Sequence, residues 1–136
     1  MNTKSKPNII VFFTDQQRWD TSSLHGNPLS LMENFDHYAV EGTHLYNSFT
    51  CQPVCGPARA SLQSGMYATK TGCFKNRIPL KKNIKTLAKH LSKEGYATGY
   101  IGKWHLGSSE PVKKEDRGGY DYWLGSNLLE FTSDAY

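Results

Sequence analysis

A cysteine and an arginine that could take part in chemistry lie within residues 50–65. Pro57 is a favourable first residue of a helix, because its missing N–H would have no partner there. Gly65 is a favourable end, because glycine tolerates the left-handed conformation that follows a helix. This pattern predicts a short helix with Cys55 just before its N-terminus, where partial positive charge collects. A thiol there, with Arg59 four residues on, is a candidate reactive group, although a buried, inert cysteine beside a turn explains the local pattern as well.

A second pair of chemical groups follows a β-prone run at residues 96–102. Lys103 and His105 stand on either side of Trp104. In an extended backbone both side chains would point to the same face. A cation and a general acid or base on one face suit a bound anion, but this spacing alone is a weak signal.

A third candidate group follows the apolar run of residues 8–14. A continuous apolar, β-branched and aromatic run predicts a strand buried on both faces, as in a parallel sheet. Asp15 and Gln16 would lie at the carboxyl end of that strand, where sites in open α/β sheets are found. The local sequence is equally consistent with a second role for Asp15, in which its side chain caps a turn.

The elements that must position these groups alternate between strands and helices, which predicts an α/β fold. Asn83 is the predicted cap and Gly95 the predicted end of one helix. Residues 66–80 are predicted to be a connector, residues 108–119 a loop and residues 120–125 additional apolar cover. The predicted elements are a strand over 8–14, a helix over 31–41, a strand over 43–49, the helix that ends at Gly65, a helix over 84–94 and a strand over 96–102.

Composition limits the possible classes of protein. The chain has 136 residues, enough for one modest domain, and a net charge of +4. This charge suits an anionic substrate, while the scattered basic residues disfavour nucleic-acid binding. No apolar run reaches the length of a membrane span and no secretory signal is visible, so we expect a cytoplasmic protein without a membrane partner. An odd number of cysteines disfavours a disulfide framework, and a zinc site built from Cys51, Cys55 and Cys73 lacks a convincing second pair.

Three segments together resemble a known family. The segment Cys55-Gly56-Pro57-Ala58-Arg59, followed by Leu62, Ser64 and Gly65, is similar to the long signature of the type I sulfatases, in the alkaline-phosphatase-like superfamily. Residues 8–15 resemble the opening strand of that family, and residues 102–107 resemble its second motif. The resemblance implies the N-terminal part of an alkaline-phosphatase-like fold, with a mixed, mostly parallel sheet flanked by helices.

The resemblance implies a role for each candidate residue. Cys55 would be oxidised by a formylglycine-generating maturase, and the hydrated aldehyde would be the nucleophile that attacks the sulfur of an organic sulfate ester. One hydroxyl of the diol would attack, and the second would lose its proton as the aldehyde re-forms and sulfate leaves. Arg59 would stabilise the diol, Lys103 would bind sulfate oxygens, and His105 would hydrogen-bond the diol or assist its deprotonation.

A divalent cation is also implied by the resemblance. Asp15 and Gln16 match the family's first pair of metal ligands, and Cys55 as formylglycine would be a further ligand. More common members have two aspartates, so Gln16 would contribute a neutral amide oxygen. Oxygen ligands suit a hard cation, with calcium expected and magnesium as the alternative. The metal would hold the sulfate oxygens and the attacking diol.

The resemblance also sets an expectation about completeness. The family's second pair of metal ligands, another lysine and another histidine lie further along its longer fold. We therefore expect residues 1–136 to be a truncated N-terminal portion of a catalytic domain, with impaired hydrolysis. A phosphonate or phosphodiester hydrolase of the same superfamily and a non-catalytic remnant remain alternatives.

Overall fold

The computed structural model describes residues 5–128, which fall into two compact units. The first unit spans residues 1–48 and the second residues 49–136. The candidate ligands Asp15 and Gln16 belong to the first unit, and the other candidate residues belong to the second. Each unit is therefore described by itself. None of the helices within residues 5–128 is long and apolar enough to cross a membrane.

Residues 5–48 of the first unit contain three short helical elements. Two are single 3₁₀ turns, η1 (Trp19–Thr21) and η2 (Ser23–His25), and the third is α1 (Glu33–Glu41). The Ser22 hydroxyl accepts a hydrogen bond from the amide of Leu24 at 3.1 Å, which caps η2. The helix predicted over residues 31–41 is confirmed, with its first turn beginning two residues later.

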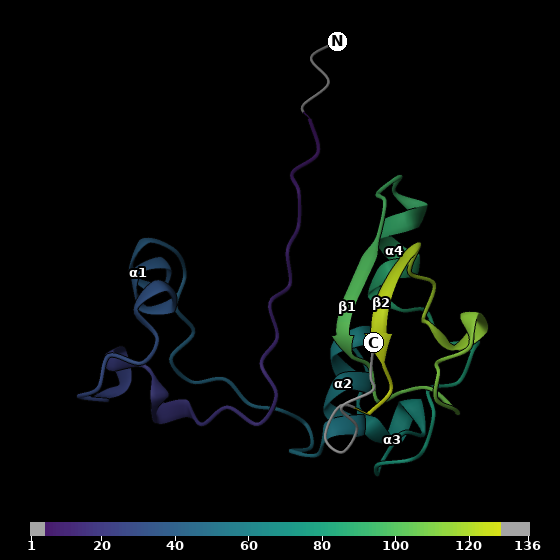
Figure 1. Cartoon of the computed structure of the whole chain (residues 1–136), viewed down its shortest axis with the longest axis horizontal. Coiled ribbons are helices and arrows are strands. Elements are labelled where there is room, and N and C mark those ends of the chain that lie inside the picture. The colour runs from purple at the N-terminus through teal and green to yellow at the C-terminus, as the bar shows by residue number, and fades with distance from the viewer. Residues whose placement is uncertain (1–4, 129–136) are drawn as a thin grey trace. The chain divides into compact units, whose positions relative to one another are not determined.

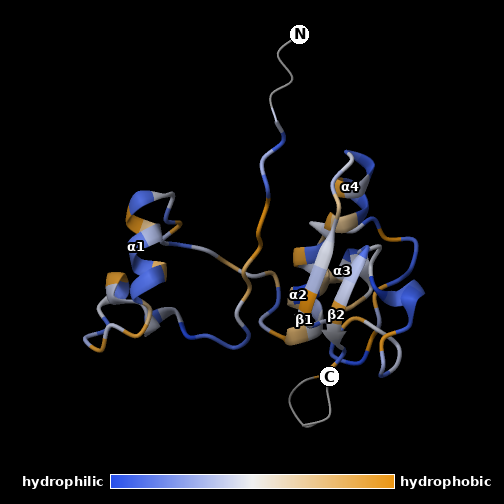
Figure 2. Ribbon diagram, turned by 45° about the horizontal axis from the view of Figure 1, so that its top comes forward, coloured by the Kyte–Doolittle hydropathy of each residue, from blue (hydrophilic) through white to orange (hydrophobic). Residues whose placement is uncertain are grey.

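The strands predicted over residues 8–14 and 43–49 are wrong for this structure, because neither segment has the conformation and pairing of a strand. Ile10 is 89% exposed and Phe12 is 90% exposed, although burial on both faces was predicted. Figure 2 shows this apolar run as an orange stretch of the extended segment before α1. A strand is stabilised by the ladder of hydrogen bonds to a neighbouring strand and by side chains packed on its faces, so apolar composition alone does not form one.

The second unit begins with α2 (Cys55–Ser64), followed by α3 (Ala68–Thr71) and α4 (Leu87–Lys93). Cys55 is itself the first residue of α2, two residues earlier than the predicted start at Pro57. Gly65, with φ of +66°, ends the helix in the left-handed conformation as predicted. Helix α3 lies within the segment predicted to be a connector.

Helix α4 starts later than its sequence pattern predicted. Its cap is Thr86 rather than Asn83, and the Thr86 hydroxyl accepts a hydrogen bond from the amide of Lys89 at 3.3 Å. The same hydroxyl donates to the carbonyl of Gly118. This long-range contact favours Thr86 over Asn83 as the N-cap of α4, and the local sequence does not predict it.

Two parallel strands, β1 (Gly99–Lys103) and β2 (Tyr122–Ser126), lie side by side in the second unit (Figure 1). Their register pairs Gly99 with Tyr122 and Lys103 with Ser126. The segment predicted only as apolar cover thus contains β2. Asp121 positions the start of β2, because its carboxylate accepts hydrogen bonds from the amide and hydroxyl of Thr98, both at 2.9 Å.

The core of the second unit forms between α2 and the segments that follow α3 and β1. Its buried residues come from α2, from the segment after α3, from the segment after β1 and from the loop before the 3₁₀ turn η3 (Lys114–Asp116). They are Ala60, Cys73, Trp104, Leu106 and Val112. The α/β class that the sequence predicted is thus confirmed in this unit, and the core joins the two segments that carry the candidate chemistry.

Candidate active site

The structure brings Cys55 and Lys103 together across 48 residues of sequence. The Lys103 ammonium group lies 3.7 Å from the Cys55 sulfur and donates a hydrogen bond to it. Cys55 is half-buried at the N-terminus of α2, where the backbone dipoles favour negative charge. Lys103 is only 7% exposed. A cation and a helix N-terminus therefore converge on the side chain of Cys55.

Arg59 connects α2 to the end of β1. Its side chain is 6% exposed, and its Nη1 donates to the carbonyl oxygen of Lys103 and, at 3.4 Å, to the hydroxyl oxygen of Tyr100. The Tyr100 hydroxyl in turn donates to the same Lys103 carbonyl. The arginine therefore acts on the backbone of Lys103, and so fixes where the lysine side chain starts.

Tyr100 is a residue of this site that the sequence analysis missed. Burial raises the pKa of its phenol, so the hydroxyl remains a neutral donor to the Lys103 carbonyl. Its ring stacks on Trp123, with ring centroids 5.1 Å apart and planes inclined by 18°. Its position in the β-prone run predicted a strand, but no local signal indicated a contact with Arg59.

Two side chains fix the start of α2 and were also missed. The Asn76 side-chain oxygen accepts a hydrogen bond from the amide of Gly56 at 2.8 Å, and the Gln52 side-chain amide donates to the carbonyl of Phe74 at 2.6 Å. The first amides of a helix lack partners within the helix, so Asn76 satisfies one of them directly beside Cys55. These contacts connect the loop that includes Phe74 and Asn76 to the segment around Cys55.

The segment after β1 departs from the extended geometry that the sequence analysis assumed. His105 has φ of +59°, in the left-handed region, and the residue is 7% exposed. The extended backbone from which a shared face of Lys103 and His105 was predicted is therefore not present at His105. Lys103 ends β1, and its ammonium group contacts the Cys55 sulfur.

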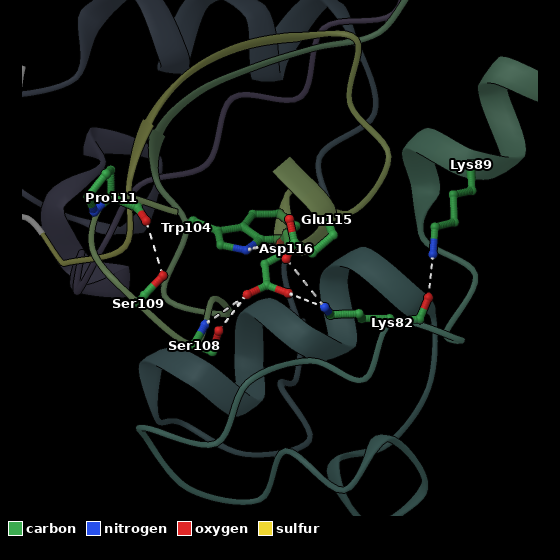
Figure 3. Close-up of polar contacts among 8 residues, drawn as sticks. All are labelled: Lys82, Lys89, Trp104, Ser108, Ser109, Pro111, Glu115 and Asp116. Carbon is green, nitrogen blue, oxygen red and sulfur yellow. Dashed lines mark hydrogen bonds and ion pairs between the residues drawn. The ribbon is translucent and has the colours of Figure 1, made fainter. Parts of the chain in front are cut away.

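Trp104, between these residues, anchors the segment in the core. Its amide donates to the Ser126 carbonyl at 2.7 Å, and its indole Nε1 donates to the Asp116 carbonyl at 3.0 Å (Figure 3). The Asp116 carboxylate accepts a 2.6 Å hydrogen bond from the Ser108 hydroxyl and lies 3.7 Å from the Lys82 ammonium group. The Ser108 hydrogen bond, followed by the charge of Lys82, lowers the pKa of Asp116. This network holds both ends of the loop that follows the candidate site.

The candidate metal ligands offer the right kind of donor but only part of a coordination shell. Asp15 supplies a carboxylate and Gln16, in a left-handed conformation with φ of +55°, an amide oxygen. Oxygen donors of this kind suit a hard cation, which takes about six to eight of them. Among the described residues, no group of three or more His, Cys, Asp or Glu side chains could hold a metal. The two residues therefore offer the oxygen donors that calcium or magnesium prefers, but too few of them to complete a coordination shell.

The other two cysteines differ from Cys55 in their surroundings. The exposed Cys51 sulfur lies 2.8 Å from the Ser61 hydroxyl oxygen. Cys73 is buried in the core, its thiol donates to the Ile78 carbonyl at 3.1 Å, and burial raises the pKa of this thiol. Cys73 is therefore an inert core residue, and the described residues contain no three-ligand cluster that would support a zinc site.

A family model described as Sulfatase matches residues 7–135. The chain therefore belongs to the sulfatase family, which confirms the resemblance of its motifs. The fold agrees, because the solved structure of a protein in complex with its substrate D-glucosamine-2-N,6-O-disulfate is similar over 88% of this chain and 23% of its own, at 34% identity and a TM-score of 0.76. This similarity confirms the α/β fold of an N-terminal sulfatase region.

Curated relatives support the same assignment. The chain is 39% identical over 132 residues to the sulfatase YidJ of Escherichia coli (strain K12), covering 91% of this chain and 26% of that protein. It is 39% identical over 122 residues to an ulvan-active sulfatase of Formosa agariphila, covering 88% of this chain and 24% of that protein. The chain thus spans about a quarter of the length of the curated relatives it matches.

Proposed function

We propose that this chain supplies the nucleophile side of a site that hydrolyses organic sulfate esters. The observation that carries this proposal is the 3.7 Å contact between the Lys103 ammonium group and the sulfur of Cys55, which is the first residue of α2. A sulfate group placed here would meet a buried cation and the positive end of a helix. Membership of the sulfatase family and the sulfated sugar bound by the structural relative support the substrate class.

Each side chain has a role that follows from its position. Lys103 binds sulfate oxygens and stabilises the charge that develops on them during attack. Arg59 and Tyr100 hold the Lys103 backbone carbonyl, so the ammonium group stays beside residue 55. His105, buried on the segment that follows, is assigned to hydrogen bonding or proton transfer at the nucleophile.

The reactive group at residue 55 is proposed to be formylglycine, made from Cys55 by a maturase. The aldehyde, when hydrated, supplies a hydroxyl nucleophile and a second hydroxyl for release of sulfate. The half-buried position at a helix N-terminus suits an oxygen nucleophile that gains negative charge. Lys103 lies where it favours that charged form.

Asp15 and Gln16 are proposed to contribute oxygen ligands to a divalent cation, calcium in preference to magnesium. The cation would supply Lewis-acid stabilisation of the sulfate when bound. The further ligands that it needs are not among the described residues, so we propose that residues 1–136 correspond to the N-terminal portion of a sulfatase catalytic domain. Hydrolysis by these residues alone is then expected to be slower than by a full-length relative.

Mass spectrometry and sulfate binding test this proposal. The 136-residue chain, produced with a formylglycine-generating enzyme, is expected to show a loss of about 18 Da in the peptide that contains Cys55. Inorganic sulfate is expected to shift the Gly56 amide resonance, and Lys103→Met to weaken sulfate binding about tenfold, which reflects loss of one buried charged contact. Lys113→Met, which removes an exposed lysine in the loop before η3, is the control and should bind sulfate as the unsubstituted chain does.

Two outcomes would contradict the proposal. An unmodified thiol at Cys55 would favour a non-catalytic remnant, and equal sulfate binding by the Lys103 and Lys113 variants would remove Lys103 from the site. Turnover of an aryl sulfate and an aryl phosphonate monoester should also be compared. Faster hydrolysis of the phosphonate would identify a phosphonate hydrolase instead.

A further inference from the structure

Charge is distributed unevenly along this chain. Residues 42–93 contain nine of its sixteen Lys and Arg residues and none of its twelve Asp and Glu residues. The rest of the chain carries seven basic and twelve acidic residues and is therefore negative. The positive charge is thus concentrated in the segment that contains α2, α3 and α4, and such a concentration attracts anions.

Within this segment, the loop of residues 74–78 packs against the first turn of α2. The Asn76 side-chain oxygen lies 2.8 Å from the Gly56 amide nitrogen. A Cβ atom added to Gly56 would lie 3.5 Å from the Asn76 Cα and 3.6 Å from the Lys75 carbonyl oxygen. The loop backbone is therefore in close contact with the residue that follows Cys55.

Two cations of this loop, Lys75 and Arg77, flank Asn76 and are exposed. Neither forms an ion pair with another residue in the described part of the chain, whereas Lys82 lies 3.7 Å from the Asp116 carboxylate. Arg77 also has φ of +69°, in the left-handed region that residues other than glycine rarely adopt. Strained residues of this kind are concentrated at ligand-binding positions, where the surrounding structure maintains them.

We propose that Lys75 and Arg77 bind a second negatively charged group of the substrate while its reacting sulfate lies at Cys55 and Lys103. This inference rests on the proposed function, and it deepens that function by naming the substrate class. The preferred substrates are organic sulfate esters that carry at least one further anionic group, a sulfate or a carboxylate, near the reacting one. Lys75 and Arg77 are then specificity-determining residues.

The expected preference is modest, because both cations are exposed to solvent. Exposed ion pairs stabilise by about 0.2–1 kcal/mol, which corresponds to roughly a 1.4- to 5-fold gain in affinity per cation. The two cations together should therefore favour a doubly charged ligand by about five- to tenfold at low salt. Salt screens exposed charges, so the preference should fall as the ionic strength rises above about 0.1 M.

Calorimetric titration of the 136-residue chain with two inert probes tests the inference. Benzenesulfonate carries one anionic group and benzene-1,3-disulfonate carries two. The chain should bind the disulfonate about ten- to twentyfold more tightly, because the five- to tenfold effect of the two cations multiplies the statistical factor of about two for two equivalent groups. The double variant Lys75→Gln/Arg77→Gln should reduce this ratio to about two. The double variant Lys85→Gln/Lys93→Gln removes the same charge from exposed positions in the same acid-free segment and should keep the full ratio.

The outcomes separate this inference from the proposed function. If the chain binds both probes but the two double variants show the same ratio, the specificity role of Lys75 and Arg77 is refuted while the sulfate site stands. If the chain binds neither probe, the proposed function fails and this inference fails with it. Urea denaturation of both double variants checks that any loss of binding does not arise from unfolding.

Discussion

Replacement of Tyr100 by phenylalanine is the sharpest test of how this site is held together. The substitution removes one hydroxyl group, which donates to the Lys103 carbonyl and receives a 3.4 Å contact from Arg59. It keeps the aromatic ring that stacks on Trp123. The change therefore isolates a buried hydrogen bond at the carboxyl end of β1.

The structure sets the size of the expected effect. A buried hydrogen bond contributes about 0.5–1.5 kcal/mol to the free energy of unfolding. After the Tyr100→Phe change the Lys103 carbonyl still accepts from Arg59, so no acceptor is left without a partner. We therefore expect a loss of about 1 kcal/mol, which corresponds to a decrease of about 0.3–1 M in the urea midpoint.

Urea unfolding monitored by tryptophan fluorescence measures this loss, with Tyr122→Phe as the matched control. Tyr122 is 58% exposed on the neighbouring strand, so its variant should change stability by less than about 0.5 kcal/mol. Burial raises the pKa of Tyr100, so its stabilising effect should persist from pH 7 to pH 9 and be lost as the pH rises above about 10. Equal midpoints for the two variants would refute the idea that Tyr100 supports Lys103.

Two further predictions concern the elements around the site. Gly118→Ala should destabilise the chain by about 2–4 kcal/mol in urea unfolding, because φ is +66° and the added Cβ would lie 2.7 Å from the Trp104 ring. Gly65 has the same φ but open space around it, so Gly65→Ala should cost only about 1 kcal/mol. Equal losses of stability in the two variants would rule out the clash. The hydrogen bonds from Thr98 lower the pKa of Asp121, so the stability that this carboxylate provides is present above its ordinary pKa of about 3.9 and is lost as the pH falls through the lowered value. The decrease in urea midpoint from pH 7 to pH 3 should therefore be smaller for Asp121→Asn than for the unsubstituted chain. An equal decrease in both would contradict this role.

The sequence predicted the parts of the site that depend on neighbouring residues. A proline, a glycine and an unbroken run between them predicted α2, and two motifs that resemble the sulfatase family proposed Cys55, Arg59 and Lys103 as site residues. Helix signals are local, because caps and terminal glycines act within one turn of the helix. Even so, the start of α2 was misplaced by two residues.

Tertiary structure decided the contacts that join distant segments. Asn76 lies 20 residues beyond Gly56, and Tyr100 lies 41 residues beyond Arg59, so no local pattern predicted either hydrogen bond. The apolar run of residues 8–14 shows the opposite case, in which a strong strand pattern forms no strand within the described chain. A strand requires a partner strand at the correct register, and the sequence of one segment does not determine whether such a partner is present.

Cys55 combines both kinds of information. Its neighbours in sequence determine that it begins a helix and that it matches the sulfatase signature, because these are properties of a short segment. Its 3.7 Å contact with Lys103 exists only because Arg59 and Tyr100 hold the end of β1 beside α2. Contacts of side chains between the two segments, rather than either segment alone, bring the Lys103 ammonium group to Cys55.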